Sequence, residues 1–419
     1  MLTSRLYSFA LRCATPIGRL WLRRQPRHAP LLERFAPRVP QTAARAVWIH
    51  ACSLGEVNAA QPLVQELQKT LGAERVAVSA STISGKERAT KLFGEDGTFF
   101  CPFDTPAAVD HTLDELRPAA LVLIDTEIWP NLILGCARRG IPVLVINGRL
   151  SDRHFKKYRR LRRLFRPVFE KLNGVYVQTD LYADRFRALG CRPERVHVTG
   201  SLKYDAVAVE ADRSARDRLR RACGIPEQAP VLVFGSTRPG DERLASACWS
   251  TLREEQPELR LIVALRHVDR ATETTAFFDE PVLLRSSVQA GRAPQGERVI
   301  LVDTLGELPH FYALADVAVV GGSFYPGVEG HNPLEPAALG IPAVFGPYMS
   351  NFGEPAAVLV AARGAIQVPC AEDLYGVLSH LLAQPVEARN IGTRARKAVL
   401  DRRGAVARNV AAILGHLPR

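Results

Sequence analysis

The sequence lacks the short motifs that identify several large classes of enzyme. None of its eight cysteines belongs to a Cys-x-x-Cys pair, and their scattered positions indicate neither a disulfide framework nor a zinc site. Neither Gly-x-x-x-x-Gly-Lys nor Gly-x-Gly-x-x-Gly occurs, which argues against a P-loop nucleotidase and a nicotinamide-dependent enzyme. No two aspartates stand two residues apart, so the Asp-x-Asp metal site of many sugar-nucleotide enzymes is also missing. These absences predict a protein of a reducing compartment that works without a metal or other cofactor.

Basic charge is unevenly distributed along the 419 residues. The formal net charge is +12, of which residues 1–38 hold +7 and residues 153–166 hold +8, so the rest of the chain carries −3. A protein that binds nucleic acid along its length would spread its basic residues over a continuous groove. The two local patches therefore disfavour nucleic acid as a partner.

The N-terminal segment has the pattern of a basic amphipathic helix. Arg5, Arg12 and Arg19 are seven residues apart and share a helical face beside apolar residues that include Phe9 and Trp21. A spanning helix needs about 20 mostly apolar residues, whereas here arginines interrupt every apolar run. We expect residues 1–38 to form a membrane anchor on an anionic membrane surface, followed by a linker. An organelle transit peptide and an ordinary surface helix are the alternatives.

The second basic patch, RHFKKYRRLRRLFR at residues 153–166, places its apolar residues at the spacing of a helix. Interleaved aromatic and basic side chains occur in segments that bind nucleic acid and in segments that bind acidic lipids. Since the basic N-terminal segment belongs to the same lobe, a phosphorylated lipid surface is the more coherent partner.

Short apolar runs alternate with amphipathic stretches in two successive series, as in repeated βαβ units on a parallel sheet. The runs are 47–50, 76–80, 121–125, 143–147 and 175–178, and then 231–235, 261–265, 299–302, 317–321 and 343–346. The polar segment 203–221 between the two series predicts an interdomain linker. The chain is longer than one hydrophobic core usually serves. We therefore expect an α/β protein of two Rossmann-like lobes, 39–206 and 207–419, that face each other across a ligand-binding cleft.

Strand ends of the first lobe carry residues suited to acid–base or anion-binding chemistry. Glu56, in IHACSLGEV, starts a helix, where a carboxylate can deprotonate a hydroxyl or simply complement the helix dipole. Asp125 and Glu127, in IDTEIWPNL, are two residues apart on a strand and are expected to point the same way, as catalytic groups or as caps. Lys203, in TGSLKYD, can bind a carboxylate or phosphate as a point charge, although lysines in such places are usually solvent-exposed.

The second lobe gathers candidate ligand-binding residues at successive strand ends. The stretch GGSFYPGVEGHNPLEPAALG combines a glycine pair, which lets a ligand approach the backbone, with a helix start whose free amides can hold a phosphate or carboxylate. The spacing of Asn332 and Glu335 also fits a capping box that needs no ligand. Together the strand ends outline a nucleotide pocket, and its candidate residues are Ser236, Arg266, His267, Gly306, Glu307, Asn332 and Glu335.

Taken in order, these motifs resemble those of the bacterial 3-deoxy-D-manno-octulosonic acid (Kdo) transferases of lipopolysaccharide assembly. The resemblance runs from about Val47 to Glu354, through HACSLGE, STISGKERA, PFDTPAAV, DTEIWPNL, NGRLSDRHFKKYRRL, TGSLKYD, STRPGDE, LRHVDR, DTLGELPHFYALAD and GGSFYPGVEGHNPLEPAALG. The chain departs from the family's usual pattern at Asp125, where the family usually has Glu, and at Leu265 and Val268, where it usually has Pro. The resemblance implies a GT-B fold. It also implies transfer of Kdo from CMP-Kdo to a lipid A precursor, lipid IVA, at the cytoplasmic face of the inner membrane.

The resemblance also assigns roles by position in the matching motifs. Glu56 corresponds to the general base and Glu127 to a second important acid, with Lys203 near the donor. The implied CMP-binding residues are Arg266, His267, Gly306, Glu307, Asn332 and Glu335, while Arg88 and Arg149 are candidates for binding substrate phosphates or the carboxylate. The expected reaction inverts the anomeric configuration. A transferase that uses a UDP-sugar and a non-catalytic lipopolysaccharide-binding protein on the same fold are the alternatives.

Overall fold

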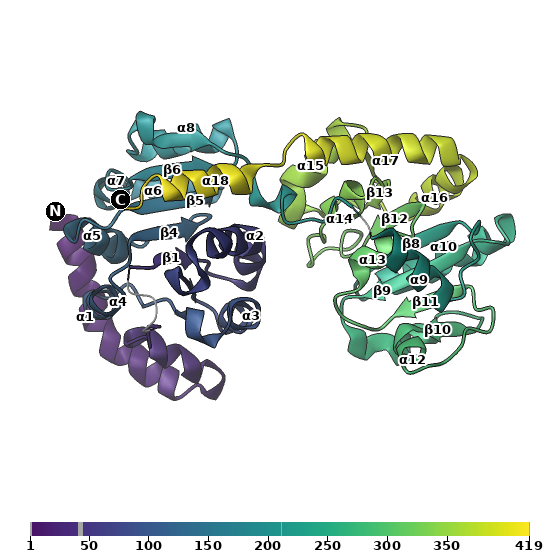
Figure 1. The fold of residues 1–419 in the computed structure, drawn as a ribbon, viewed down its shortest axis with the longest axis horizontal. Helices are drawn as coiled ribbons and strands as arrows, with labels where there is room; N and C mark the ends of the chain where they lie inside the picture. Colours follow the sequence, from purple (N-terminus) through teal and green to yellow (C-terminus); the bar gives the residue numbers. More distant parts are fainter. Residues whose placement is uncertain (1, 41–44, 211, 419) are drawn as a thin grey trace. The chain divides into compact units, whose positions relative to one another are not determined.

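The computed structural model describes residues 2–40, 45–210 and 212–418, and the chain divides into two compact units (Figure 1). The first unit contains Met1–Ala206 and Arg402–Arg419, and the second contains Val207–Asp401. The assignment of all of 207–419 to the second lobe is therefore wrong for residues 402–419. These residues return to the first unit because Val410 and Ile413 are buried in its hydrophobic core.

The first unit is built on a parallel sheet in the order β3-β2-β1-β4-β5-β6-β7. The strands are β1 Val47–His50, β2 Val76–Ala80, β3 Thr98–Phe100, β4 Ala120–Ile124, β5 Val143–Gly148, β6 Gly174–Val177 and β7 Val196–Val198. Because successive side chains of a strand point to opposite faces, the sheet forms one core against α4, α5, α7 and α8 and another against α2, α3 and α18.

The helices of the first unit flank this sheet on both faces (Figure 1). The α-helices are α1 Leu2–Arg23, α2 Leu54–Leu71, α3 Ile83–Phe93, α4 Pro106–Leu116, α5 Pro130–Arg138, α6 Asp152–Arg160, α7 Arg162–Phe169, α8 Asp180–Leu189 and α18 Ala405–Leu414. The 3-10 helices are η1 Pro26–Phe35, η3 Ala73–Arg75, η4 Glu95–Gly97, η5 Pro193–Arg195 and η6 Leu202–Tyr204.

The second unit repeats this architecture on a parallel sheet in the order β10-β11-β9-β8-β12-β13-β14. The strands are β8 Val231–Thr237, β9 Arg260–Leu265, β10 Val282–Leu284, β11 Val299–Val302, β12 Val317–Val320, β13 Ala343–Phe345 and β14 Ala365–Gln367. The helices are α9 Arg213–Ala222, α10 Asp241–Glu255, η7 Val268–Arg270, α11 Ala271–Thr275, α12 Arg285–Gln289, α13 Leu308–Tyr312, α14 Leu334–Ala338, η8 Ser350–Phe352, α15 Gly353–Ala361, α16 Leu374–Ala383 and α17 Pro385–Leu400. The expected linker 203–221 thus contains most of α9.

In each sheet the strand order reverses at the first strand of the unit. In the first sheet β1 lies between β2 and β4, and in the second β8 lies between β9 and β12. Loops that follow neighbouring strands at such a point diverge to opposite faces and leave a crevice at the carboxyl ends of the strands, where ligands of open α/β sheets bind. The candidate residues after β1, β4 and β8 lie at these two points.

The N-terminal helix α1 presents both basic and apolar side chains to solvent. Arg5, Arg12 and Arg19 are exposed, and Phe9 and Ile17 are 66% and 73% exposed. Within residues 2–40, 45–210 and 212–418, no helix has the length and apolar character needed to cross a membrane. The helix is held to the first unit by polar contacts of its inner side.

Part of the segment expected to be a linker is packed into the first unit. Arg34, on η1, is buried, donates hydrogen bonds to the carbonyl oxygens of Cys101 and Ser81, and stacks its guanidinium 4.2 Å from the centre of the Phe103 ring. In α1, the hydroxyl of Tyr7 donates to Asp104 at 3.0 Å. These contacts join the N-terminal segment to the loops that follow β2 and β3.

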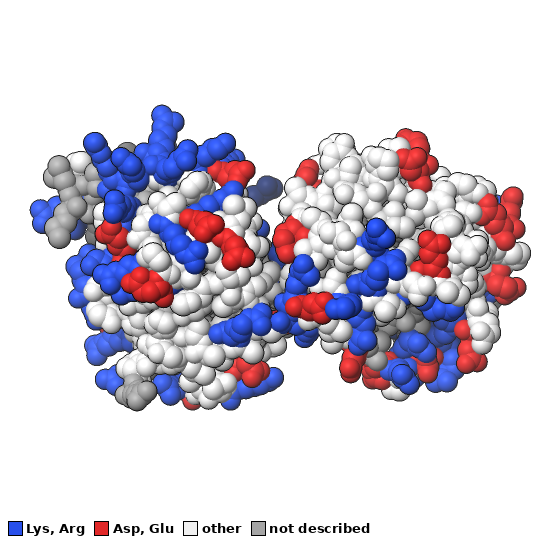
Figure 2. Space-filling view, turned by 90° about the horizontal axis from the view of Figure 1, so that it is seen from above, with Lys and Arg blue, Asp and Glu red and all other residues white. Residues whose placement is uncertain are grey.

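The basic segment 153–166 forms two short helices, α6 and α7, rather than one. The helical register breaks at Leu161, while Tyr158 and Phe165 pack together in the core with ring centres 4.6 Å apart. The basic side chains remain on the surface, and Figure 2 shows Lys and Arg crowded on the face of the first unit that is in view.

Candidate active site

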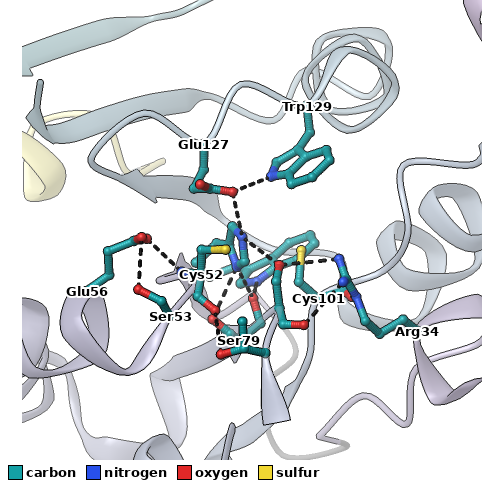
Figure 3. Close-up of polar contacts among 12 residues, drawn as sticks. Arg34, Cys52, Ser53, Glu56, Ser79, Cys101, Glu127 and Trp129 are labelled. Carbon is teal, nitrogen blue, oxygen red and sulfur yellow. Dashed lines mark hydrogen bonds and ion pairs between the residues drawn. The ribbon is translucent and has the colours of Figure 1, made fainter. Parts of the chain in front are cut away.

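Glu56 lies in the first turn of α2, directly after β1. Its carboxylate accepts a hydrogen bond from the backbone N–H of Cys52 at 2.8 Å and one from the hydroxyl of Ser53 at 3.2 Å (Figure 3). These bonds hold the carboxylate at the helix N terminus, where the helix dipole favours negative charge. The side chain remains partly accessible to solvent and to a substrate.

Glu127 approaches the same place from the loop after β4. Its Oε2 atom accepts a hydrogen bond from the indole of Trp129 at 2.9 Å and lies 3.7 Å from Nε2 of His50 (Figure 3). One carboxylate oxygen of Glu127, one of Glu56 and the sulfur of Cys52 all lie within 4.8 Å of one another. The structure therefore brings together the two residues predicted to be catalytic.

The two carboxylates have opposite electrostatic surroundings. Burial raises the pKa of Glu56 to about 7, and the negative charges of Asp125 and Glu127 contribute in the same direction. Burial also tends to raise the pKa of Glu127. The hydrogen bond and charge of His50, with smaller contributions from other hydrogen bonds, outweigh burial and hold the pKa of Glu127 below its usual value. Glu127 is thus ionised at neutral pH, while Glu56 is poised to gain or lose a proton there.

Asp125 does not lie on a strand as expected, so the reason for expecting it to point the same way as Glu127 does not hold. Strand β4 ends at Ile124, and Asp125 has a φ of 61°, a left-handed conformation that is uncommon for a residue other than glycine. Its carboxylate instead accepts a hydrogen bond from the side-chain amide of Asn147 at 2.6 Å and pairs with Arg149 at 2.8 Å. This pair brings Arg149 to the edge of the site.

The other two candidates of the first unit lie on its neighbouring elements. Arg88, on α3, donates to Asn58 of α2 at 2.6 Å. Lys203, on η6, belongs to the first unit, and its positive charge acts on Asp125. Lys203 thus belongs to the first unit, whereas the other predicted donor-binding residues belong to the second.

The sulfur of Cys52 and the two carboxylates could also contact a metal ion, so their chemistry needs a test. Burial and the charges of Glu127 and Glu56 raise the pKa of the Cys52 thiol to about 12. A cysteine binds metals as the thiolate, whereas hard cations prefer oxygen ligands and here would find only two carboxylates. The set therefore gives no positive indication of a metal, and metal independence stays a prediction.

In the second unit, cationic side chains gather at the carboxyl ends of β8 and β9. Arg238 donates a short hydrogen bond to Nε2 of His267, and Arg266 is close enough to affect the ionisation of both His331 and Glu335. Burial, followed by the charges of Arg266, Arg238 and His267, lowers the pKa of His331 to about 4. This concentration of positive charge is suited to an anionic ligand.

The remaining donor-site candidates differ in their surroundings. Asn332 donates from its side-chain amide to Glu335 at 3.2 Å and accepts from the N–H of Leu334 at 3.1 Å. These are not the two reciprocal bonds of a capping box, and α14 has Pro333 at its N-cap with no side-chain cap bond. Ser236, at the end of β8, has a φ of 56°. Glu307, which follows Gly306, forms a two-pronged ion pair with Arg285 and accepts hydrogen bonds from Gln289 and Thr304.

Sequence reasoning missed several residues of these two places. His50 and Trp129 stand inside the quoted motifs HACSLGE and DTEIWPNL, and His331 stands inside the glycine-rich stretch. The sequence feature that could have identified them is a polar or aromatic side chain at the end of a predicted strand. Which of them turn toward a carboxylate or a neighbouring cation depends on loop conformation, which the pattern of apolar residues does not specify.

Comparison with known proteins identifies the family of the chain. The family model of the 3-deoxy-D-manno-octulosonic-acid transferases (kdotransferases) matches residues 29–206. A 3-deoxy-D-manno-octulosonic acid transferase of Bordetella pertussis is 32% identical over 428 residues, covering 97% of this chain and 98% of the relative.

Two solved structures are similar in fold. A UDP-GlcNAc 2-epimerase of Neisseria meningitidis has a TM-score of 0.59 at 14% identity, covering 88% of this chain and 100% of the other. MurG of Acinetobacter baumannii has a TM-score of 0.58 at 14% identity, covering 88% and 99%. These likenesses confirm the GT-B fold class, with two Rossmann-like α/β lobes. The extent and identity of the match to the Bordetella protein show that the chain belongs to the 3-deoxy-D-manno-octulosonic acid transferase family of glycosyltransferases.

Proposed function

We propose that this protein transfers Kdo from CMP-Kdo to lipid IVA, a lipid A precursor, with inversion at the anomeric carbon and with Glu56 as the general base. The observation that carries the proposal is the pairing of Glu56 with an ionised Glu127 at the point where the first strand order reverses. A base works best when its pKa is near the pH at which it operates, and burial and neighbouring charge raise the pKa of Glu56 to about 7.

The chemistry follows from the position of the base. The Glu56 carboxylate takes the proton of an acceptor hydroxyl while that oxygen forms a bond to C2 of Kdo. The bond from C2 to the phosphate oxygen breaks on the opposite face, and CMP leaves with the electron pair as a phosphate monoester anion. This leaving group is already a stable anion, so it needs little protonation. The transition state has oxocarbenium character, as in glycoside chemistry generally.

The second unit supports an anionic donor. Arg238 and Arg266 concentrate positive charge at the strand ends, and CMP-Kdo carries both a phosphate and a carboxylate. Arginine can hold such groups through two parallel hydrogen bonds. A UDP-sugar would also be attracted to this charge, so the donor has to be identified by experiment.

The exposed side chains of α1 support a place at a membrane. Its arginines and large apolar side chains fit a helix that lies in the headgroup region of an anionic leaflet, where lipid IVA is embedded. We place the reaction at the cytoplasmic face of the inner membrane.

The full chain, incubated with CMP-Kdo and lipid IVA, is expected to release CMP and add the mass of Kdo to the lipid. Glu56→Gln should lower kcat by about 10²- to 10⁴-fold. The matched control is Glu66→Gln on the same helix, where the carboxylate is half exposed and pairs with Lys69. Release of UDP from a UDP-sugar would favour the alternative donor, absence of any turnover would favour a binding protein, and near-normal turnover of folded Glu56→Gln would exclude Glu56 as the base.

A further inference from the structure

His50, the last residue of β1, is a completely buried histidine beside the candidate active site. It is 0% exposed. Its Nδ1 atom lies 3.2 Å from the carbonyl oxygen and 3.1 Å from the hydroxyl of Ser79, on β2. Its Nε2 atom lies 3.7 Å from Oε2 of Glu127 and 3.5 Å from the hydroxyl of Ser81. Buried polar side chains normally have such partners, so the contacts alone do not distinguish a structural from a functional role.

The partners of the ring determine where its protons lie. A hydrogen on Nε2 would point toward the carboxylate of Glu127, whereas a lone pair there would face its negative charge. Nδ1 faces the carbonyl oxygen of Ser79, which can only accept a hydrogen bond. Each nitrogen therefore has an acceptor beside it, as the positively charged imidazolium requires.

The orientation of the ring is fixed by residues that take no part in the proposed chemistry. The indole of Trp48 donates to the hydroxyl of Ser79 at 2.7 Å, and Arg34 donates to the hydroxyl of Ser81 at 3.3 Å. These bonds fix the positions of the two serine hydroxyls, and the hydroxyls in turn contact the two nitrogens of the His50 ring. The partly buried carboxylate of Glu127 thus contacts a rigid, buried support.

The titratable groups around His50 come from every element that packs against it. They are Glu127 from the loop after β4, Glu56 from α2, Cys52 between β1 and α2, Cys101 after β3 and Arg34 from η1. Burial lowers the pKa of His50, but the neighbouring Cys101 thiol and the Glu127 carboxylate outweigh burial and raise it. In turn, the charge of His50 lowers the pKa of Glu127 and that of Glu56. A cation at this position therefore stabilises the state in which both carboxylates are ionised.

We propose that His50 is a positioning residue for the transfer reaction, which holds the Glu127 carboxylate beside Glu56 and lets both carboxylates remain ionised together. This inference rests on the proposed function. His50 is buried and contacts Glu127 rather than a substrate, so it acts through that carboxylate.

His50→Gln tests the inference because glutamine can keep an N–H group near the place of Nε2 while removing the positive charge. Without the charge, the Glu56–Glu127 pair should take up its first proton at higher pH. The acid side of the pH profile of kcat should therefore move up by about one pH unit, with kcat about 10-fold lower at pH 6.5 and largely recovered at pH 8.5. The KM for CMP-Kdo should stay within about twofold, since His50 lies in the other unit from the proposed donor site.

Two further variants keep the test decisive. His416→Gln is the matched control, because His416 is a partly buried histidine of the same unit whose Nδ1 contacts the carbonyl of Ala412, and its profile should be that of the wild type. If His50→Gln does not fold, Ser81→Ala removes one support of the ring and should shift the profile in the same direction by a smaller amount.

The outcomes separate the inference from the proposed function. If the wild type uses CMP-Kdo but folded His50→Gln has an unshifted pH profile, the role of His50 alone would be overturned. The same holds for an unshifted profile of Ser81→Ala where His50→Gln is unfolded. A uniform loss of kcat at every pH would also overturn it, because a merely structural histidine would behave in that way. Failure of the wild type to use CMP-Kdo would overturn both proposals.

Discussion

At the scale of single residues, the protonation of Glu56 links the active site to stability. Its pKa is about 7 in the folded protein, against an ordinary value of 4.5. Between these two pH values the folded state keeps a proton that the unfolded chain has released. The stabilising contribution of this proton is therefore complete below pH 4.5 and is lost as the pH rises through 7. A carboxylate held in this way lowers the stability of the resting enzyme at neutral pH.

Glu56→Gln should accordingly stabilise the protein while it strongly lowers turnover. Glutamine keeps an acceptor oxygen for the N–H of Cys52 but cannot ionise. We expect the free energy of unfolding in urea to rise by on the order of 2 kcal/mol at pH 8 and by almost nothing at pH 4.5. Equal effects at both pH values would show that the change does not come from the ionisation of Glu56.

The packing of Gly235 gives a second prediction at this scale. A Cβ atom added at this residue of β8 would lie 1.9 Å from the hydroxyl oxygen of Tyr312, whose side chain is itself buried. Gly235→Ala must therefore displace the ring or the strand, at a cost of about 1–3 kcal/mol in the free energy of unfolding of the second unit. Gly376→Ala is the control. This glycine is exposed on α16 with no atom within 4 Å of an added Cβ, so the change should be neutral or stabilising by about 1 kcal/mol.

At the scale of elements, the sequence identified the long central strands and missed the short outer ones. The apolar runs 47–50, 76–80 and 299–302 coincide with β1, β2 and β11. The four strands missing from the prediction are the outermost strands of the two sheets, and each has three residues: β3, β7, β10 and β14. An outer strand pairs on one side only and is too short to show a periodic pattern, so its position depends on the strand beside it.

Some features of the candidate site could likewise be predicted from the sequence, and others could not. Glu56 and Glu127 could be chosen from the sequence because each follows a predicted strand within a rare motif. The left-handed conformation of Asp125 could not be predicted, because it arises where β4 ends one residue before the predicted boundary. The contact of buried His50 with Glu127 could not be predicted either, since it depends on the conformation of the loop that follows β4.

The return of α18 to the first unit is an element-scale feature with a clear test. Asp205 accepts hydrogen bonds from the N–H groups of Gly404 and Val406, and Ile413 is completely buried against the first sheet. Ile413→Ala should cost about 2–5 kcal/mol and speed amide hydrogen exchange in α2 and the first sheet.

The matched substitution is Ile391→Ala on α17, because Ile391 is buried in the second unit. It should speed exchange in the second sheet and leave α2 unchanged. If Ile413→Ala instead loosened the second sheet, residues 402–419 would belong with the second unit, as the sequence had suggested.

At the scale of the whole molecule, charge and exposed apolar surface are concentrated in the first unit. The surface of α1 combines exposed arginines with large exposed apolar side chains, and the basic helices α6 and α7 belong to the same unit. Each basic residue near an anionic leaflet contributes about 1 kcal/mol, and salt screens that attraction over about 10 Å at 0.1 M. Apolar side chains that enter the interface add a contribution that salt does not weaken.

Binding to lipid vesicles should therefore depend on both contributions. The double variant Phe9→Ser with Ile17→Ser should weaken binding to vesicles containing anionic lipid by about 10- to 100-fold in a sedimentation assay, because two exposed apolar side chains are lost from the helix. Val386→Ser, which removes an apolar side chain that is 63% exposed on α17 of the second unit, should leave binding unchanged. Raising the salt concentration should weaken vesicle binding by the double variant and by Val386→Ser to the same extent, since neither change alters a charge. Equal binding of the double variant and the control would show that α1 is an ordinary surface helix, and any membrane affinity would then have to come from α6 and α7.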